Sequence, residues 1–262
     1  MDLAIAGKNA LVLASSRGLG KGIAAALAKE GANVIMCGRT ADLLQANCDA
    51  INSQGGGRAD WIQGDLCDLH FADSVATEAL HKLGRVDILV NNSGGPPPGS
   101  TEDMTEVKLL SHFQSMVLNL IGIANRLLPG MKDIGWGRIL TVASSGVIEP
   151  IPGLALSNTL RPALAGWSKT LASEIARFGV TSNMLLPGSI QTDRLNSLNM
   201  IAAERSGRTV EQVSADAQTA IPIGRYGTVE EFAATAAFLC SAPASYITGA
   251  VIRCDGGSSR SV

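Results

Sequence analysis

Residues 137–161 read GRILTVASSGVIEPIPGLALSNTLR, and this segment decides the fold. It begins with a short apolar run, Ile139 to Val142, which is typical of a strand buried on both faces. Two serines, Ser144 and Ser145, follow the run, and a proline-rich crossover then leads into a long helix. A strand, a loop and a helix in this order predict one βα unit of a parallel sheet.

The same order recurs along the whole sequence. Six further strand-like runs are expected at residues 9–14, 32–37, 59–63, 86–90, 180–185 and 251–253, with helical segments between them. Because these runs are continuously apolar rather than alternating, they predict a parallel seven-stranded sheet with helices on both faces. No linker or repeat interrupts the series, so we expect a single α/β, doubly wound (Rossmann) domain over residues 1–262. A polar segment at about 192–219 is expected to be helical in pieces and to act as a substrate lid.

Composition excludes several classes of protein. A hydrophobic content of 46% is enough for a full core, and a net charge of −2 provides no electrostatic footprint for nucleic acid. The sequence contains no run of about 18 apolar residues, so we expect no membrane span. The N-terminus lacks the pattern of a signal peptide, so we expect a cytoplasmic protein. The five cysteines and three histidines show no metal-type spacing, so no metal site or disulfide is expected.

A glycine-rich loop, ASSRGLG at residues 14–20, connects the first strand to its helix. Ligands of open parallel sheets bind beyond the carboxyl ends of the strands. Glycines at such a turn let the backbone approach a pyrophosphate, which the helix N-terminus then stabilises. Taken alone, the loop is also compatible with an ordinary turn between a strand and a helix.

By spacing and flanks, residues 137–161 resemble the catalytic segment of the short-chain dehydrogenase/reductase family. That family has a serine after this strand, matched by Ser144, and a Tyr-x-x-x-Lys pair on the next helix. Here Ser157 stands in the tyrosine place and Arg161 in the lysine place. Residues 14–20 resemble the family's Gly-x-x-x-Gly-x-Gly loop, with Ala14 in place of the first glycine. An alanine at positive φ would cost energy there.

The resemblance covers essentially residues 7–260 and implies a nucleotide site. The loop NNSG at residues 91–94 resembles the family's Asn-Asn-Ala-Gly, and residues 187–192, PGSIQT, resemble the segment that closes over the nicotinamide. The cofactor-binding positions implied are Ala14, Ser16, Arg17, Gly18, Leu19, Gly20, Arg39, Asp65, Leu66, Asn91, Ser93, Gly94, Arg161, Pro187, Gly188, Ile190 and Thr192.

Two arginines favour NADP(H) over NAD(H). An acid at the end of the second strand reads the ribose of NAD, whereas an arginine accommodates the 2′-phosphate of NADP. This sequence has no acid there, and Arg39 follows the strand while Arg17 lies in the glycine loop. We expect both to converge on the phosphate; the alternative is that they are solvated surface cations.

The expected catalytic residues are Asn119, Ser144, Ser157 and Arg161, with Glu149 as a hypothetical proton donor if it is partly buried. Serine is a far weaker acid than a phenol, and a guanidinium stays protonated, so neither substitution keeps the family's proton relay. Because Pro162 suits the first turn of a helix, we expect the helix to begin near Arg161.

Residues GGPPPG at 94–99, the loop at Glu149 and LSNTLRPAL at 156–164 resemble a ketoacyl-carrier-protein reductase-like branch of the family. The resemblance implies an NADP(H)-dependent oxidoreductase acting on a carbonyl or alcohol, with an acyl thioester as an open possibility. An inactive nucleotide-binding sensor or scaffold is the alternative, and a non-redox lyase or isomerase is the third hypothesis. The family also implies a homo-oligomer, namely a tetramer.

Overall fold

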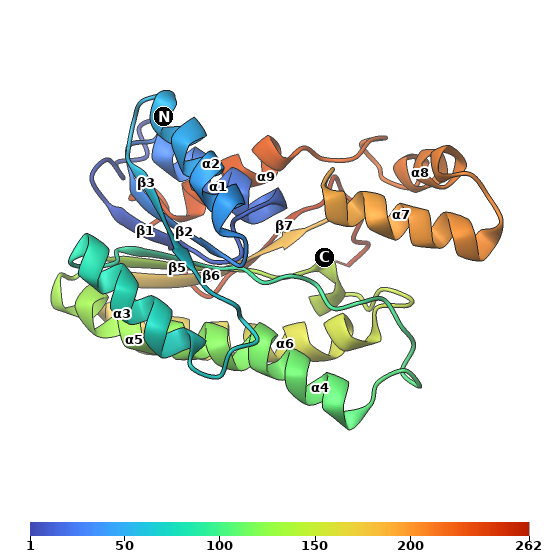
Figure 1. Ribbon diagram of the computed structural model, residues 1–262, viewed down its shortest axis with the longest axis horizontal. Coiled ribbons are helices and arrows are strands. Elements are labelled where there is room, and N and C mark those ends of the chain that lie inside the picture. Colours follow the sequence, from blue (N-terminus) through green and yellow to red (C-terminus); the bar gives the residue numbers. More distant parts are fainter. Residues whose placement is uncertain (262) are drawn as a thin grey trace.

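One parallel sheet organises the molecule, and its strands lie in the order β3-β2-β1-β4-β5-β6-β7 (Figure 1). The computed structural model describes residues 1–261. Within them the strands are β1 (Asn9–Val12), β2 (Asn33–Gly38), β3 (Ala59–Gln63), β4 (Ile88–Asn91), β5 (Gly137–Val142), β6 (Val180–Pro187) and β7 (Val251–Cys254). The order reverses between β1 and β4, and such a switch point opens a ligand crevice beyond the carboxyl ends of the strands. The predicted fold class is confirmed.

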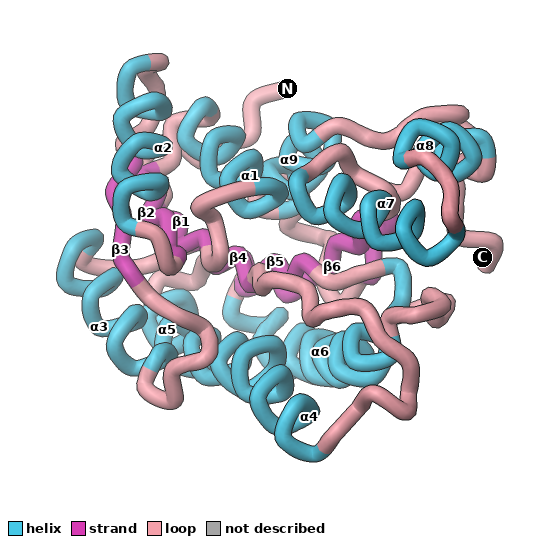
Figure 2. The backbone as a smooth tube through the Cα atoms, turned by 45° about the vertical axis from the view of Figure 1, so that its right-hand side comes forward, coloured by secondary structure: helices cyan, strands magenta, loops and turns pink. Residues whose placement is uncertain are grey.

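Helices cover both faces of the sheet (Figure 2). One layer contains α1 (Gly18–Lys29), α2 (Ala41–Ser53) and α9 (Val229–Leu239); the other contains α3 (Phe71–Leu83), α4 (Glu106–Phe113), α5 (Asn119–Asp133) and α6 (Ala155–Ile175). Side chains of β1 alternate between two cores: Ala10 and Val12 pack on the first layer, and Leu11 and Leu13 on the second. Because both faces are buried, the strands are apolar throughout.

The polar segment after β6 folds into two helices, α7 (Asp193–Ser206) and α8 (Val210–Thr219), as the sequence predicts. Thr192 caps α7 by accepting a hydrogen bond from the Leu195 amide, and Thr209 begins α8 with a full capping box. Both helices project beyond the carboxyl ends of the strands (Figure 1). The segment therefore lies at the mouth of the crevice.

A 28-residue helical segment, Glu106–Asp133, combines α4, a π-helical turn at Gln114–Leu118 and α5. By length and composition it could cross a membrane, with a mean hydropathy of 1.3. However, Met116, Leu120, Ile123 and Leu127 are buried in the core beneath the sheet. We therefore interpret this segment as a core helix.

The predicted start of α6 is wrong: the helix begins at Ala155 rather than near Arg161. The loop before it is fixed by Asn158, whose Nδ2 donates to the Ile151 carbonyl (2.8 Å) and whose Oδ1 accepts from the Ile151 amide (3.1 Å). This anchoring holds the first turn in place, so Pro162 lies inside the helix and removes one of its hydrogen bonds. Ser157 and Arg161 consequently lie one turn apart on the same face.

We predict that Pro162→Ala raises the free energy of unfolding by about 1–3 kcal/mol, because it restores a helix hydrogen bond. The control is the exposed neighbour Ala163, where substitution by glycine should lower the free energy of unfolding by about 1 kcal/mol. Urea denaturation of both variants measures these changes. If Pro162→Ala leaves the free energy of unfolding unchanged, the proline must occupy a helix N-terminus, where it removes no hydrogen bond.

Candidate active site

The glycine-rich loop connects β1 to α1 in a strained, close-packed turn. Ala14 has φ = 46°, which confirms that alanine adopts the left-handed conformation there, and Gly18 has φ = 55°. A Cβ on Gly20 would lie 2.5 Å from the Ala14 carbonyl oxygen, so only glycine allows this approach. Asn92 fastens the loop to β4 because its Nδ2 donates to the carbonyls of Leu13 and Ala14, both at 3.2 Å.

The first turn of α1 carries no acidic side chain, and its N-terminal amides open toward the crevice. This arrangement attracts an anion such as a pyrophosphate. Thr192 lies against the start of α1, since the Cγ2 of Thr192 would be 3.7 Å from a Cβ placed on Gly18. Of the other predicted loop residues, Ser16 and Leu19 are half-buried beside it.

The two arginines of the predicted phosphate site have different surroundings. Arg17 is drawn toward α7, where its Nη1 lies 3.7 Å from a carboxylate oxygen of Asp193. Arg39 is exposed immediately after β2, and Ser16 lies beside the same strand end, within 3.2 Å of a Cβ placed on Gly38. Arg17 thus contacts the opposite charge on α7 and Arg39 lies at the end of β2, while their joint binding of a 2′-phosphate stays a prediction.

The remaining predicted cofactor residues lie after the ends of β3 and β4. Asp65 is exposed after β3 and accepts a hydrogen bond from the Cys67 amide (3.0 Å), and Leu66 is half-buried. A Cβ on Gly94 would meet nothing within 4 Å, which leaves open space at the switch point. In residues 1–261, the buried Ser93 hydroxyl has no hydrogen-bond partner. An open position beside an unpaired buried hydroxyl fits a bound dinucleotide.

The segment after β6 closes the other side of the crevice. Gly188 must be glycine because a Cβ would lie 2.6 Å from Cα of Asp255. Pro187 ends β6, and the buried Ile190 forms a parallel bridge with Gly227. Thr192 follows and begins α7, so this segment carries the chain from the sheet to the glycine loop.

Ser144 and the two substituted positions lie on neighbouring elements. Ser144 follows β5, is half-buried, and its Oγ accepts from the Gly146 amide at 3.2 Å. Ser157 and Arg161 each expose only 6% of their surface. The Arg161 guanidinium donates from Nη1 to the Val142 carbonyl (3.2 Å), at the end of β5.

Arg161 is a buried cation without an anionic partner. Its Nε has no hydrogen-bond partner in the described chain, and none of the ion pairs of residues 1–261 includes it. Burial, and secondarily the positive charge of Arg194, lower the pKa of Arg161 to about 10. The guanidinium thus remains protonated at neutral pH. A desolvated charge of this kind is costly unless a ligand compensates it.

The surroundings of two further predicted catalytic side chains, Asn119 and Glu149, are as follows. Asn119 uses its Nδ2 to hold the loop after β3, donating to the carbonyls of Leu66 and Asp68, both at 2.8 Å. Its amide is therefore committed to loop structure. Glu149 is exposed, so the partial burial that the proton-donor hypothesis requires is not found.

The sequence analysis missed Arg194, in the first turn of α7. Its Nη2 donates to the Pro96 carbonyl at 2.6 Å, and a Cβ on Gly95 would be 3.3 Å from the same nitrogen. Partial burial lowers its pKa, and its charge in turn lowers that of Arg161. Its only sequence signal was its position two residues after Thr192.

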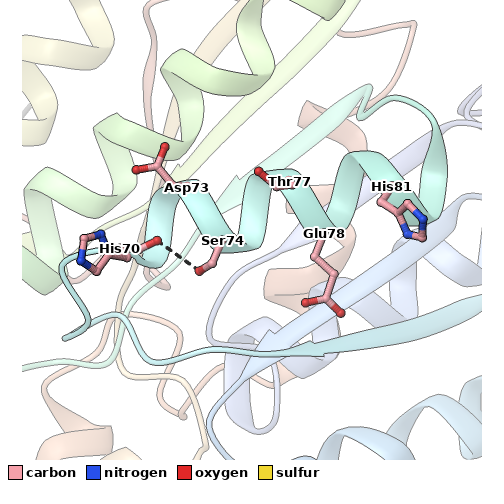
Figure 3. A pocket seen from close by; sticks show the side chains of 6 residues that line it. All are labelled: His70, Asp73, Ser74, Thr77, Glu78 and His81. Carbon is pink, nitrogen blue, oxygen red and sulfur yellow. Dashed lines mark hydrogen bonds between the residues drawn. The ribbon is translucent and has the colours of Figure 1, made fainter.

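A shallow surface depression runs along α3 (Figure 3) and is lined by His70, Asp73, Ser74, Thr77, Glu78 and His81. All six residues belong to this helix or to its N-cap. Since no residue of the crevice contributes to it, we do not assign the depression to the site.

The switch-point crevice, the glycine loop at a helix N-terminus and the serine beyond β5 define a dinucleotide-binding α/β protein. The family model described as enoyl-(acyl carrier protein) reductase matches residues 13–259. The chain belongs to the short-chain dehydrogenase/reductase family.

Relatives of known activity match over nearly the full length. The chain is 32% identical to 3-oxoacyl-[acyl-carrier-protein] reductase FabG of Aquifex aeolicus, covering 98% of this chain and 99% of the relative. It is 29% identical to the NADPH-dependent reductase BacG of Bacillus subtilis, covering 97% and 99%. The structure of L-sorbose reductase from Gluconobacter frateurii, in complex with NADPH and L-sorbose, superposes with a TM-score of 0.95 at 29% identity, and each chain is covered completely.

The similarity confirms the prediction of an oxidoreductase that uses NADP(H) and acts on a carbonyl or alcohol group. It does not favour the sensor or the lyase and isomerase hypotheses.

We predict that Ala14→Gly raises the free energy of unfolding by about 0.5–1 kcal/mol, because it relieves the left-handed strain at this residue. A matched control is Ala25→Gly within α1, which should lower that free energy by a similar amount, about 1 kcal/mol. Thermal or urea denaturation distinguishes the two. A lower free energy of unfolding for Ala14→Gly would contradict the backbone strain inferred at Ala14.

Proposed function

We propose that this chain reduces a ketone with NADPH, or oxidises the corresponding alcohol with NADP⁺, in the crevice between Ser144 and α7. The observation that carries the proposal is the buried, protonated Arg161 in the place where the family has its lysine. The unpaired Ser93 hydroxyl and the glycine cradle of residues 14–20 support a dinucleotide beside it. A 3-oxoacyl thioester is one carbonyl substrate compatible with this proposal.

The nucleotide supplies the hydride. Residues 14–20 and the N-terminus of α1 hold the pyrophosphate, Arg39 binds the 2′-phosphate, and the segment from Pro187 to Thr192 covers the nicotinamide side. The exposed Asp65, with Leu66, borders the adenine. Residues 91–94 line the floor of the crevice at the switch point.

Hydride addition to a carbonyl develops negative charge on its oxygen. In our proposal the Ser144 hydroxyl donates a hydrogen bond to that oxygen, and the Arg161 cation stabilises the charge electrostatically. In our proposal a water molecule takes the place of the family's phenol beside the shorter Ser157; it donates the proton that completes the alcohol, and bulk solvent reprotonates the hydroxide left behind. The active site is in this sense atypical for the family, because no phenol relays the proton.

The preference for NADP(H) rests on Arg39. It is exposed at the end of β2, where no carboxylate competes for a ribose hydroxyl, and Arg17 is engaged with Asp193. A single guanidinium then provides the bidentate contact to a 2′-phosphate.

We predict that Arg39→Ala weakens NADPH binding at least about tenfold and leaves NADH binding within about twofold, because only NADPH carries the 2′-phosphate. Titration calorimetry measures both. Arg58→Ala, an exposed cation before β3, is the control and should change neither. An equal loss of affinity for NADPH and NADH would contradict the assignment of Arg39 to the 2′-phosphate. If the wild-type chain binds neither nucleotide, the proposed function is overturned.

We predict that Ser144→Ala lowers kcat/KM in a ketone screen by about 100-fold, whereas Ser145→Ala stays within about threefold, because only Ser144 contacts the reacting oxygen. NADPH affinity should be unchanged in both variants. Similar losses for the two serines would argue against a role for Ser144 in the chemistry.

Assembly is part of the proposal. Apolar side chains are exposed on the long helical segment, with Val107 at 77%, Leu110 at 61% and Leu118 at 46%. The edge strand β7 leaves Val251 exposed, and Tyr246 beside it is fully exposed. We propose that these two surfaces pair with copies of the chain in a homotetramer.

We also propose that residues 1–262 act as one domain in which α7 and α8 form a lid. The five cysteines are unpaired in residues 1–261, which supports a reducing, cytoplasmic location.

A further inference from the structure

The entrance to the crevice contains more positive charge than reduction of a ketone requires. Developing charge on one oxygen is served by Ser144 and one cation. Here Arg161 enters from α6 and Arg194 from α7, and each donates to a main-chain carbonyl, of Val142 and Pro96 respectively. In residues 1–261 neither guanidinium is paired with a carboxylate. The two cations are near enough for the charge of Arg194 to lower the pKa of Arg161, and no carboxylate of the described residues pairs with either.

The two anchoring carbonyls lie at or beyond the ends of neighbouring strands of the sheet. Val142 ends β5, and Pro96 lies in the loop that follows the neighbouring strand β4. Arg161 retains an Nε whose hydrogen no group of the described residues accepts, although the residue is more than nine-tenths buried. An unpaired buried donor of this kind indicates a ligand, because leaving its hydrogen bond unmade costs the full desolvation penalty of the donor.

The first turn of α7 separates this charge from the phosphate side of the crevice. Asp193 faces the glycine loop through its ion pair with Arg17, and Thr192 lies against Gly18. The next residue, Arg194, extends the other way, to Gly95 and Pro96. Its guanidinium is therefore on the side of Ser144 and Arg161 rather than over the pyrophosphate.

We infer that Arg161 and Arg194 bind the carboxylate of the substrate, which makes this chain a reductase of keto acids or a dehydrogenase of hydroxy acids. Carboxylate oxygens accept hydrogen bonds from two guanidinium groups and neutralise both charges. The inference rests on the proposed function, because it names the class of substrate for the same site. Arg194 is the specificity-determining residue, since Arg161 also serves the carbonyl.

Two ketones that differ only in charge test the inference. Acetoacetate carries a carboxylate, and methyl acetoacetate is its neutral ester with the same ketone. Calorimetry on the full chain, without nucleotide and with saturating NADP⁺, measures binding without turnover. We expect acetoacetate to bind at least about tenfold more tightly than the ester.

The variants locate the charge that is responsible. Arg194→Ala should reduce the preference for acetoacetate to less than about twofold, and Arg194→Lys should retain part of it, because a lysine keeps the charge without the bidentate geometry. The matched control is Arg205→Ala in the last turn of α7, which should keep the full preference. In every variant the Kd for NADPH should stay within about threefold of the wild-type value.

Three results would overturn the inference. The first is equal binding of the two ketones, and the second is binding of neither up to about 50 mM. The third is an Arg194→Ala protein that loses NADPH affinity but keeps the preference, since the guanidinium would then serve a nucleotide phosphate. If the chain binds acetoacetate selectively but neither NADPH nor NADH, the proposed function fails while the carboxylate site stands.

Discussion

Burial of the sheet on both faces determines where this protein can do chemistry. Leu11 and Leu13 pack into one core and Ala10 and Val12 into the other, so no face of β1 is available to a polar ligand. The same holds for the central strands β4 and β5, whose residues are all buried. Polar groups can reach a ligand only where the strands end. The glycine loop, the residues after β4, Ser144 and the start of α7 therefore gather at one edge.

The sequence was sufficient to predict this framework because apolar runs and glycine turns are local signals. The strand at residues 59–63 has the predicted bounds. The segment at about 192–219 is helical in pieces, as expected. The start of the helix containing Ser157 was predicted wrongly because proline is a strong local signal for the first turn of a helix. What outweighs it is not local: the Asn158 side chain clamps Ile151, and the Ala155 amide donates to the Gly99 carbonyl at 3.2 Å.

The catalytic centre was less predictable for the same reason. Residue identity placed Ser144 and Arg161 in the site, but it could not show that the amide of Asn119 is committed to the loop after β3. Nor could residue identity show that Arg17 forms an ion pair with Asp193 of α7. Each of these outcomes depends on a contact between residues more than 50 positions apart, which no spacing rule describes.

Replacing lysine by arginine changes what the centre can do. An ammonium is a compact charge that can shift its pKa and approach a phenol, whereas a guanidinium is planar, stays charged and offers several donors in a fixed plane. Arg161 donates from Nη1 to the last residue of β5, and its Nε has no partner in the described residues. Without a tyrosine at position 157 there is no phenol for a cation to activate. A fixed positive charge is therefore suited to holding an anion, rather than to relaying a proton.

The first turn of α7 connects this charge to the nucleotide. Asp193 contacts Arg17 of the glycine loop, and Arg194 contacts the loop after β4, so adjacent residues of one helix face the two halves of the crevice. Thr192 caps the same helix and lies against Gly18 of the glycine loop. Residues 192–194 therefore contact both the glycine loop and the loop after β4 from a single turn of helix.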